Sequence, residues 1–207
     1  MKVSKKWLSN FFDAKLPNAE ALAEALTFHA FEIDGVEKIG SPRRDAGAAD
    51  DEASDDVLDV KVTPNRGHDC LSHRGIAKEL SAILDIPLAQ DPFELDFDLS
   101  KKTDEVTVSI EDSKLCPRYI ARYIKGVKVG PAPEWLKTSL ESIGQRSINN
   151  VVDATNLVMF NIGQPLHAFD ADRLGSLDIG VRLAREGEEL ETLDEKKYPL
   201  KSSMLLI

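Results

Sequence analysis

The sequence predicts an α+β fold, with a small N-terminal α+β domain at residues 1–95 and the first part of a mixed α/β domain at 105–207. Stretches with apolar residues at helical spacing interchange with stretches in which apolar and polar residues alternate, which favours mixed helices and strands. Two polar stretches, 41–56 and 88–104, separate these elements. The 207 residues are 42% hydrophobic and 30% charged, which is ordinary for a globular chain with a buried core.

The N-terminal domain is expected to contain two helices, two strands and a third helix. Ser4 and Asn18 are candidate N-caps of the first two helices, since their side-chain oxygens can accept from free backbone N–H groups. Alternating apolar residues predict strands at 31–39 and 57–62. A helix at about 69–85 then places apolar residues at i, i+4 and i+7 on one face.

Residues 41–56 differ from their surroundings in composition. They read SPRRDAGAADDEASDD and contain six acidic residues but no large apolar side chain. A chain of this composition cannot bury enough apolar surface to order itself, so a solvated linker is predicted, with an acidic interaction segment as the alternative.

The second half is expected to open with a strand and a basic, strand-like run, followed by two helices. Gly144 and Gly163 are predicted to end those helices, because glycine readily adopts the left-handed conformation that closes a helix. A strand and a turn between apolar residues follow. In order, these elements are expected at 106–110, 118–129, 133–143, 150–161, 179–183 and 190–200. The chain ends on four apolar residues, 204–207, and we therefore expect it to be part of a longer protein.

Charge and composition argue against several classes of protein. Twenty-six basic against 36 acidic side chains give a net charge of −10, which disfavours non-specific nucleic-acid binding by the whole chain. No apolar run is long enough to span a membrane, and no secretory signal is evident. Cys70 and Cys116 cannot form a disulfide framework and suit a reducing compartment, so a cytoplasmic protein is expected.

His68, Asp69, Cys70 and His73 are the first candidate site, because they are metal-ligand types within six residues, and His68, Cys70 and His73 could converge. Nucleophilic Cys–His chemistry is a weaker alternative, since local spacing alone is a weak signal. No second group of ligand types has the spacing of a zinc site. The favoured interpretation is therefore a helix N-terminus capped by Asp69 or Ser72, with no metal.

A basic run is the second candidate. Two tyrosines interleave with its cations, a composition suited either to a phosphate backbone with stacked bases or to a solvated strand face. Its residues are Lys114, Arg118, Tyr119, Arg122, Tyr123, Lys125 and Lys128. Both interpretations remain open on sequence alone.

The helix at 150–161 and the turn after it are the third candidate. Its apolar residues can form one buried face, which Thr155 shares and Asn156 borders; they are Val151, Val152, Val158, Met159 and Ile162. His167 follows a Gly163-Gln164-Pro165 turn that can fold back toward the helix. A hydroxyl, an amide and an imidazole in one pocket could bind a polar ligand and orient water, and a satisfied core histidine is the alternative.

Four blocks in this order resemble the beta subunit of bacterial phenylalanyl-tRNA synthetase. They are MKVSKKWLSNFF, VTPNRGHDCLSHRGIAKEL, CPRYIARYIKGV and SINNVVDATNLVMFNIGQPLHAFDADRL. The resemblance implies an (αβ)₂ heterotetramer with an alpha subunit that carries aminoacylation with ATP and Mg²⁺, no cofactor in this chain, and tRNA(Phe) as a partner. It also implies an editing module that hydrolyses tyrosyl-tRNA(Phe), in which Thr155 and Asn156 line the pocket and His167 positions water or the tRNA 3′ end.

The chain departs from that family in three places. The acidic stretch 41–56 stands where an OB-fold tRNA-binding domain is usually inserted. The usual N-R-x-D-C is one residue longer here, N-R-G-H-D-C. The family's acidic residue that reads the tyrosine hydroxyl would lie beyond Ile207, so the chain alone is expected to be inactive. A non-catalytic docking module, binding a partner subunit or RNA through 114–128, is the alternative function, and the sequence beyond Ile207 would discriminate the two.

Overall fold

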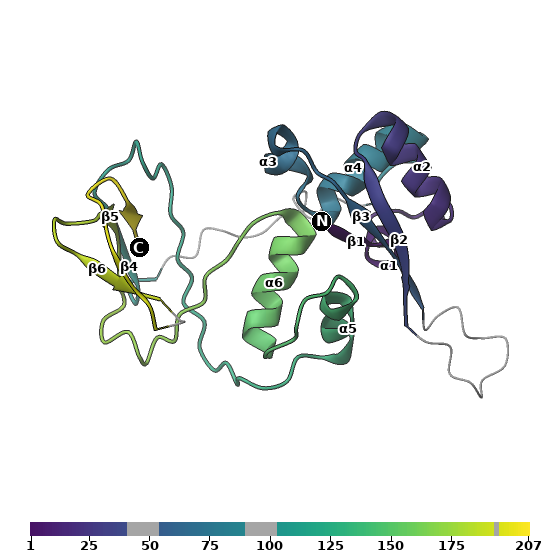
Figure 1. Cartoon of the computed structure of the whole chain (residues 1–207). Helices are drawn as coiled ribbons and strands as arrows, with labels where there is room; N and C mark the ends of the chain where they lie inside the picture. Colours follow the sequence, from purple (N-terminus) through teal and green to yellow (C-terminus); the bar gives the residue numbers. More distant parts are fainter. Residues whose placement is uncertain (41–53, 90–102, 193–194) are drawn as a thin grey trace. The chain divides into compact units, whose positions relative to one another are not determined.

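The computed structural model describes residues 1–40, 54–89, 103–192 and 195–207 (Figure 1). The expected linker at 41–53, most of the polar connector at 88–104 and part of the turn near 194 lie outside these residues. Within the described chain, helices and small sheets are mixed, so the α+β class is confirmed. None of the described helices is long and apolar enough to cross a membrane.

The described chain forms two compact units. The first contains residues 1–40, 54–89 and 128–168, and the second contains 103–127, 169–192 and 195–207. The two helices expected in the second domain therefore lie in the first unit, where one of them bonds to residues near the N-terminus. The expected domain boundary at 95–105 stays a prediction.

A three-stranded antiparallel sheet with order β1-β3-β2 lies in the first unit. Its strands are β1 (Lys2–Ser4), β2 (Ile33–Ile39) and β3 (Asp55–Val60). Leu58 of β3 is opposite Val3 on one side and Val36 on the other. β1 was missed because three residues are too short for a visible alternation. The linker expected to reach residue 56 ends earlier, because Asp55 accepts hydrogen bonds from Ser4 and Lys6 and belongs to β3.

The helices of the first unit begin where their capping residues predict. Ser4 caps α1 (Lys5–Ser9), and Asn18 caps α2 (Ala19–His29). The single helix expected at 69–85 is divided into α3 (Gly67–Cys70) and α4 (His73–Leu84), with Ser72 as the N-cap of α4. A 3₁₀ turn, η2 (Pro64–Arg66), precedes them. The remaining helices are α5 (Glu134–Ser142) and α6 (Asn150–Ile162).

One hydrophobic core joins the sheet and helices of the first unit. Its fully buried side chains come from β1, α1, α2, β3, α4 and α5, and burying each stabilises the fold by about 1.5–3 kcal/mol. They include Val3, Leu8, Leu22, Leu26, Leu58, Ile76, Leu80 and Leu140. Leu157 and Phe160 of α6 pack against this core.

The second unit is built from short strands. β4 (Thr107–Ile110) pairs in parallel with β5 (Asp178–Leu183), which pairs antiparallel with β8 (Leu205–Leu206). β6 (Glu189–Glu191) and β7 (Lys197–Pro199) form an antiparallel pair. Arg182 clamps Glu188 through two hydrogen bonds of 2.8 and 2.6 Å, and this contact lowers the pKa of Glu188 to about 2.

The basic run at 118–129 is not a strand, contrary to the prediction. From Arg118 to Val127 it makes no backbone–backbone hydrogen bond with any part of the described chain. Its alternating residues carry strand propensity, but a strand also requires a partner for its N–H and C=O groups.

Candidate functional site

Helix α6 carries two of the three predicted site residues, and both of its ends are well defined. The Asn149 side chain accepts from the N–H groups of Val151 and Val152 at 3.0 Å, and Gly163 ends the helix with a left-handed φ of 82°. Asp153 is fully buried and accepts from Ser147 and Ile148, so the preceding loop is fixed to the helix. The predicted extent of α6 and its glycine stop are confirmed.

The predicted buried face of α6 is wrong. Val151, Val152, Val158, Met159 and Ile162 are half-buried, as are Thr155 and Asn156. The opposite side of the helix meets the core instead, through Asp153, Leu157 and Phe160. Apolar residues occur all around α6, so the sequence pattern could not decide which side faces inward.

Thr155 is already bonded within its own helix. Its hydroxyl donates to the carbonyl of Val152 at 2.7 Å, a common arrangement for threonine in a helix. The hydroxyl can still accept a hydrogen bond, because an oxygen that donates keeps its lone pairs. Asn156 is the next residue and is equally half-buried.

His167 is exposed and follows the predicted turn, in which the Gln164 amide donates to the carbonyl of Pro165. Thr155 and Asn156 precede this turn, on α6 itself. The three residues therefore lie on consecutive parts of one unit, and their half-buried or exposed side chains show that the described chain does not enclose them in a pocket.

An open groove of about 620 Å³ lies at the C-terminal end of α6, and sequence reasoning did not find it. Its lining is mainly apolar and is drawn from β1, β3, α3, α6 and the segment that follows α5. The residues are Met1, Lys2, Asp59, Gly67, Leu71, Ile143, Gln145, Met159, Phe160, Gly163 and Pro165. Thr155, Asn156 and His167 are not among them.

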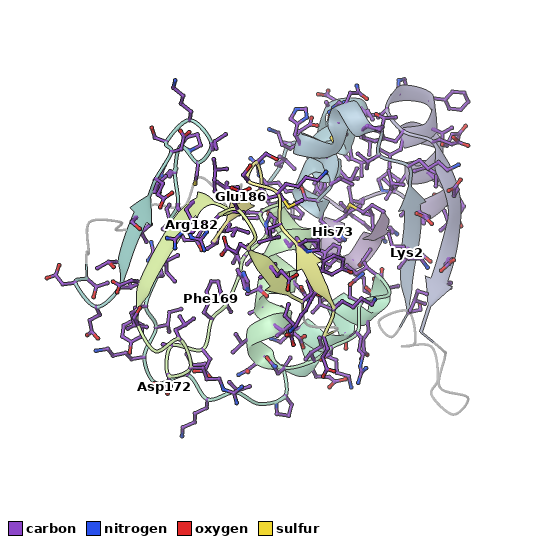
Figure 2. All side chains as sticks on the ribbon, turned by 60° about the vertical axis from the view of Figure 1, so that its left-hand side comes forward. Lys2, His73, Phe169, Asp172, Arg182 and Glu186 are labelled. Atoms are coloured by element: carbon purple, nitrogen blue, oxygen red, sulfur yellow. The ribbon has the colours of Figure 1, made fainter. Side chains whose placement is uncertain are left out.

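His73 is buried and already saturated with hydrogen bonds. Its Nε2 accepts from the backbone N–H of Ser4 at 3.1 Å, and its Nδ1 donates to the carbonyl of Phe160 at 2.9 Å. Burial lowers its pKa to about 4, with the bond to Phe160 acting in the opposite direction. Figure 2 labels His73 among the closely packed side chains of the first unit. It is a core histidine and does not converge with the exposed His68.

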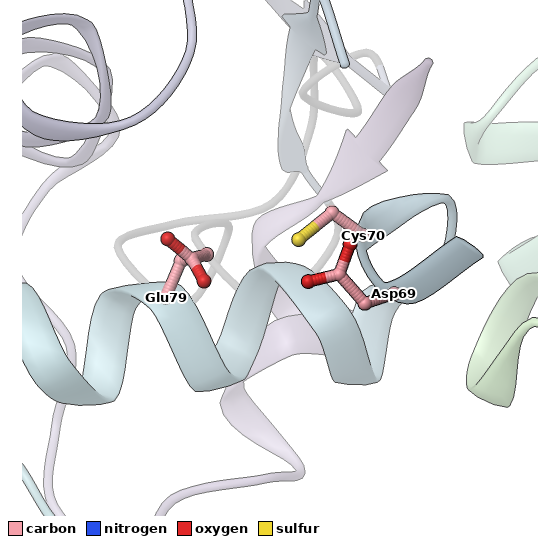
Figure 3. A group of neighbouring side chains, drawn as sticks. All are labelled: Asp69, Cys70 and Glu79. Atoms are coloured by element: carbon pink, nitrogen blue, oxygen red, sulfur yellow. The ribbon is translucent and has the colours of Figure 1, made fainter. Parts of the chain in front are cut away.

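A different group of ligand types does meet, at the junction of α3 and α4. One ligand atom each from Asp69, Cys70 and Glu79 lies within 4.8 Å of the others (Figure 3). Arg66 fills this position: its guanidinium donates to Asp69 at 2.7 Å, to Glu79 at 2.6 Å and to the Cys70 sulfur at 3.1 Å.

The chemistry of this group suits the arginine better than a metal ion. The bidentate contact with Arg66 lowers the pKa of Asp69, which keeps the carboxylate charged. Burial raises the pKa of the Cys70 thiol to about 12, so beside Arg66 the sulfur is a neutral thiol at neutral pH. We interpret the group as a structural ion cluster.

The basic run is exposed in the second unit. Arg118, Ile120, Arg122 and Ile124 all face solvent, whereas Tyr119 and Tyr123 are half-buried. Lys125 forms an ion pair with Glu105 and lies over the Tyr123 ring, so its charge is partly neutralised.

One protein family matches part of the chain. Residues 115–207 match the family described as "B3/4 domain". This match covers the basic run after Lys114, helices α5 and α6, and the second-unit strands β5 to β8.

Three relatives from different bacteria share one name, "Phenylalanine--tRNA ligase beta subunit". The protein from Rhodopirellula baltica is 42% identical over 207 residues, which is 100% of this chain and 28% of the relative. That from Dehalococcoides mccartyi strain CBDB1 is 49% identical over 154 residues, 73% of this chain and 18% of the relative. That from Bacillus cereus is 46% identical over 153 residues, 74% of this chain and 19% of the relative. The chain belongs to the phenylalanine–tRNA ligase beta-subunit family, and its matches span between 18% and 28% of the length of these relatives.

Proposed function

We propose that this chain contributes to the attachment of phenylalanine to tRNA(Phe), as part of a beta subunit of phenylalanine–tRNA ligase. The observation that carries the proposal is the 42% identity to a protein of that name along all 207 residues. In this proposal the beta subunit acts in the cytoplasm in an (αβ)₂ heterotetramer with an alpha subunit. The alpha subunit holds ATP and Mg²⁺, which supply the activation of phenylalanine.

We further propose that Thr155, Asn156 and His167 belong to an editing site that hydrolyses tyrosyl-tRNA(Phe). A site built to hydrogen-bond a phenol hydroxyl rejects phenylalanine strongly, because the apolar ring would leave buried polar groups unpaired. Thr155 and Asn156 are half-buried on α6 and can supply such groups. His167 is exposed on the loop after α6, where it can position water or the tRNA 3′ end. Hydrolysis then requires an oriented water and stabilisation of the ester charge.

The test is His167→Ala in the beta subunit assembled with its alpha partner. Deacylation of tyrosyl-tRNA(Phe) should slow by roughly 10²-fold, the scale for loss of one positioned catalytic group. Aminoacylation with phenylalanine should stay near normal. His29→Ala, an exposed histidine at the end of α2, is the matched control and should leave both reactions unchanged.

Two results would contradict the assignment: intact deacylation in His167→Ala, or equal damage to both reactions. The 207-residue chain alone should not deacylate tyrosyl-tRNA(Phe) measurably, because its three site residues are half-buried or exposed and the described residues do not enclose them in a pocket.

The exposed basic run favours a second candidate function, docking of RNA without catalysis. Binding of tRNA(Phe) to the 207-residue chain should be weak and should fall as salt rises, because the net charge of −10 opposes it. Arg118→Ala and Arg122→Ala should weaken it further. Lys125→Ala should have less effect, since Glu105 already neutralises that lysine. A sub-micromolar dissociation constant for tRNA(Phe) that does not change with salt concentration would refute this prediction.

A further inference from the structure

The last carbonyl groups of a helix have no N–H partner within that helix, and this holds for the C-terminal turn of α6. One of these carbonyls accepts a hydrogen bond from a distant part of the chain. The carbonyl of Met159 accepts from Gly163 N–H at 2.9 Å. The carbonyl of Phe160 has no such partner in its own helix, and the Nδ1–H of His73 donates to it at 2.9 Å across 87 residues of sequence. His73 therefore caps α6 from outside.

The protonation form of His73 is fixed by its two partners. Ser4 N–H is a donor, so the Nε2 atom that it reaches at 3.1 Å must carry a lone pair. The proton then resides on Nδ1, where the Phe160 carbonyl needs it. A single neutral tautomer satisfies both contacts. A proton on Nε2 would point at the Ser4 N–H, so that two donors would face each other.

Trp7 holds the neighbouring residue of the same turn. Its ring stacks on the His73 imidazole with centroids 4.1 Å apart and planes 13° from parallel. Its indole N–H donates to the Asn161 side chain at 2.8 Å. Two stacked rings, one from α1 and one from α4, thus bond to Phe160 and Asn161, which are consecutive residues of α6.

We propose that His73 and Trp7 are positioning residues, a clasp that fixes the last turn of α6 on the N-terminal part of the first unit. This inference rests on the proposed function. Through the clasp, residues near the N-terminus set the position of Thr155 and Asn156, which lie one to two turns earlier on the same helix. The two rings bond to Asn161 and Phe160, so their effect on Thr155 and Asn156 passes through α6.

Two substitutions separate the two bonds of His73. His73→Asn places an amide N–H near the former Nδ1 position and loses the acceptor for Ser4. His73→Gln places an oxygen near the former Nε2 position and loses the donor to Phe160. Trp7→Phe keeps a stacked ring and removes the indole N–H, and Trp135→Phe, an exposed tryptophan on α5, is its matched control.

Amide hydrogen exchange of the 207-residue chain is the decisive measurement. In His73→Gln and Trp7→Phe, the amides in the last two turns of α6 should exchange at least about fivefold faster, while the β2–β3 ladder changes less than twofold. Trp135→Phe should keep α6 close to wild type. His73→Asn keeps the donor to Phe160, so it should accelerate α6 exchange no more than it accelerates the β2–β3 ladder. Equal acceleration of α6 and the ladder, or unchanged α6 exchange in His73→Gln and Trp7→Phe, would overturn the clasp. Imidazole nitrogen spectra at pH 7 provide a check without substitution: the Nδ1–H tautomer is required, and the Nε2–H form would refute it.

A second measurement distinguishes this proposal from the editing function. In the beta subunit assembled with its alpha partner, Trp7→Phe should lower kcat for deacylation of tyrosyl-tRNA(Phe) about fivefold with aminoacylation unchanged. If α6 exchange responds as expected but deacylation does not, the clasp stands and the editing role of α6 is wrong. If α6 exchange does not respond, the clasp is wrong whatever the deacylation rate.

Discussion

The buried imidazole of His73 makes the stability of the first unit depend on pH. In the folded chain burial lowers its pKa to about 4, from 6.5 for an exposed histidine. Between these values the unfolded chain binds a proton that the folded chain does not, so unfolding becomes more favourable as the pH falls from 6.5 toward 4. Above pH 6.5 both states are neutral and the full stability is present. The loss amounts to about 2 kcal/mol at pH 5 and about 3 kcal/mol at pH 4.

Tryptophan fluorescence reports this transition selectively. The chain has two tryptophans, Trp7 and Trp135, and both lie in the first unit. Urea unfolding should show a midpoint about 1 M lower at pH 5 than at pH 7, at an m-value typical of a domain of this size. His29→Asn should keep the difference, since that histidine is exposed. His73→Asn should remove most of it while lowering stability at pH 7.

The window of pH 5 to 7 separates His73 from the carboxylates with lowered pKa values. Asp69 and Glu188 lose their ion-pair stabilisation only as the pH falls below their ordinary values, near 4. Equal midpoints at pH 5 and pH 7 in the wild-type chain would refute the reasoning. The same slope in His73→Asn would assign the pH dependence to another group.

Two further predictions concern the junction of α3 and α4. Gly75→Ala should destabilise the first unit by about 3 kcal/mol or prevent folding, because its Cβ would lie 2.1 Å from the Asp69 carbonyl oxygen. Gly67→Ala is the control: its Cβ would meet only the flexible Leu71 side chain at 3.4 Å, so the urea midpoint should change little. Cys70 should resist thiol reagents in the folded chain and react only on unfolding, since it is buried and its pKa is raised to about 12, whereas the half-buried Cys116 should react without denaturant. Equal labelling of both cysteines under native conditions would refute the second prediction.

The features that sequence predicted well are those fixed by neighbours in the chain. Ser4 and Asn18 cap their helices because each side-chain oxygen reaches an N–H three residues ahead. Gly163 ends α6 because glycine tolerates the φ of 82° that the helix stop requires. Such contacts close within one turn, so the residues that make them are visible in a short window of sequence.

The features that sequence missed depend on contacts with distant parts of the chain. The contacts that join α6 to the N-terminal part of the first unit include those of Trp7 and His73, which reach Asn161 and Phe160 across 154 and 87 residues. The positions of tryptophan and histidine in the sequence do not show which residues of α6 they will contact. The spacing of His68, Cys70 and His73 suggested ligands, but only the tertiary fold shows that His73 is enclosed and that Arg66 occupies the space beside Cys70.

For the candidate site, the sequence indicates which residues belong to it but not how they are arranged. Thr155, Asn156 and His167 were selected by residue type and by resemblance, and neither source states which groups face a ligand. In this chain the Thr155 hydroxyl donates within α6 and His167 is exposed, so an editing pocket requires further groups to enclose them. The basic run has the same property: Arg118 to Val127 alternate like a strand, yet their backbone groups find no partner in the described chain. Propensity therefore indicates what α6 and this run can form, while pairing decides what they do form.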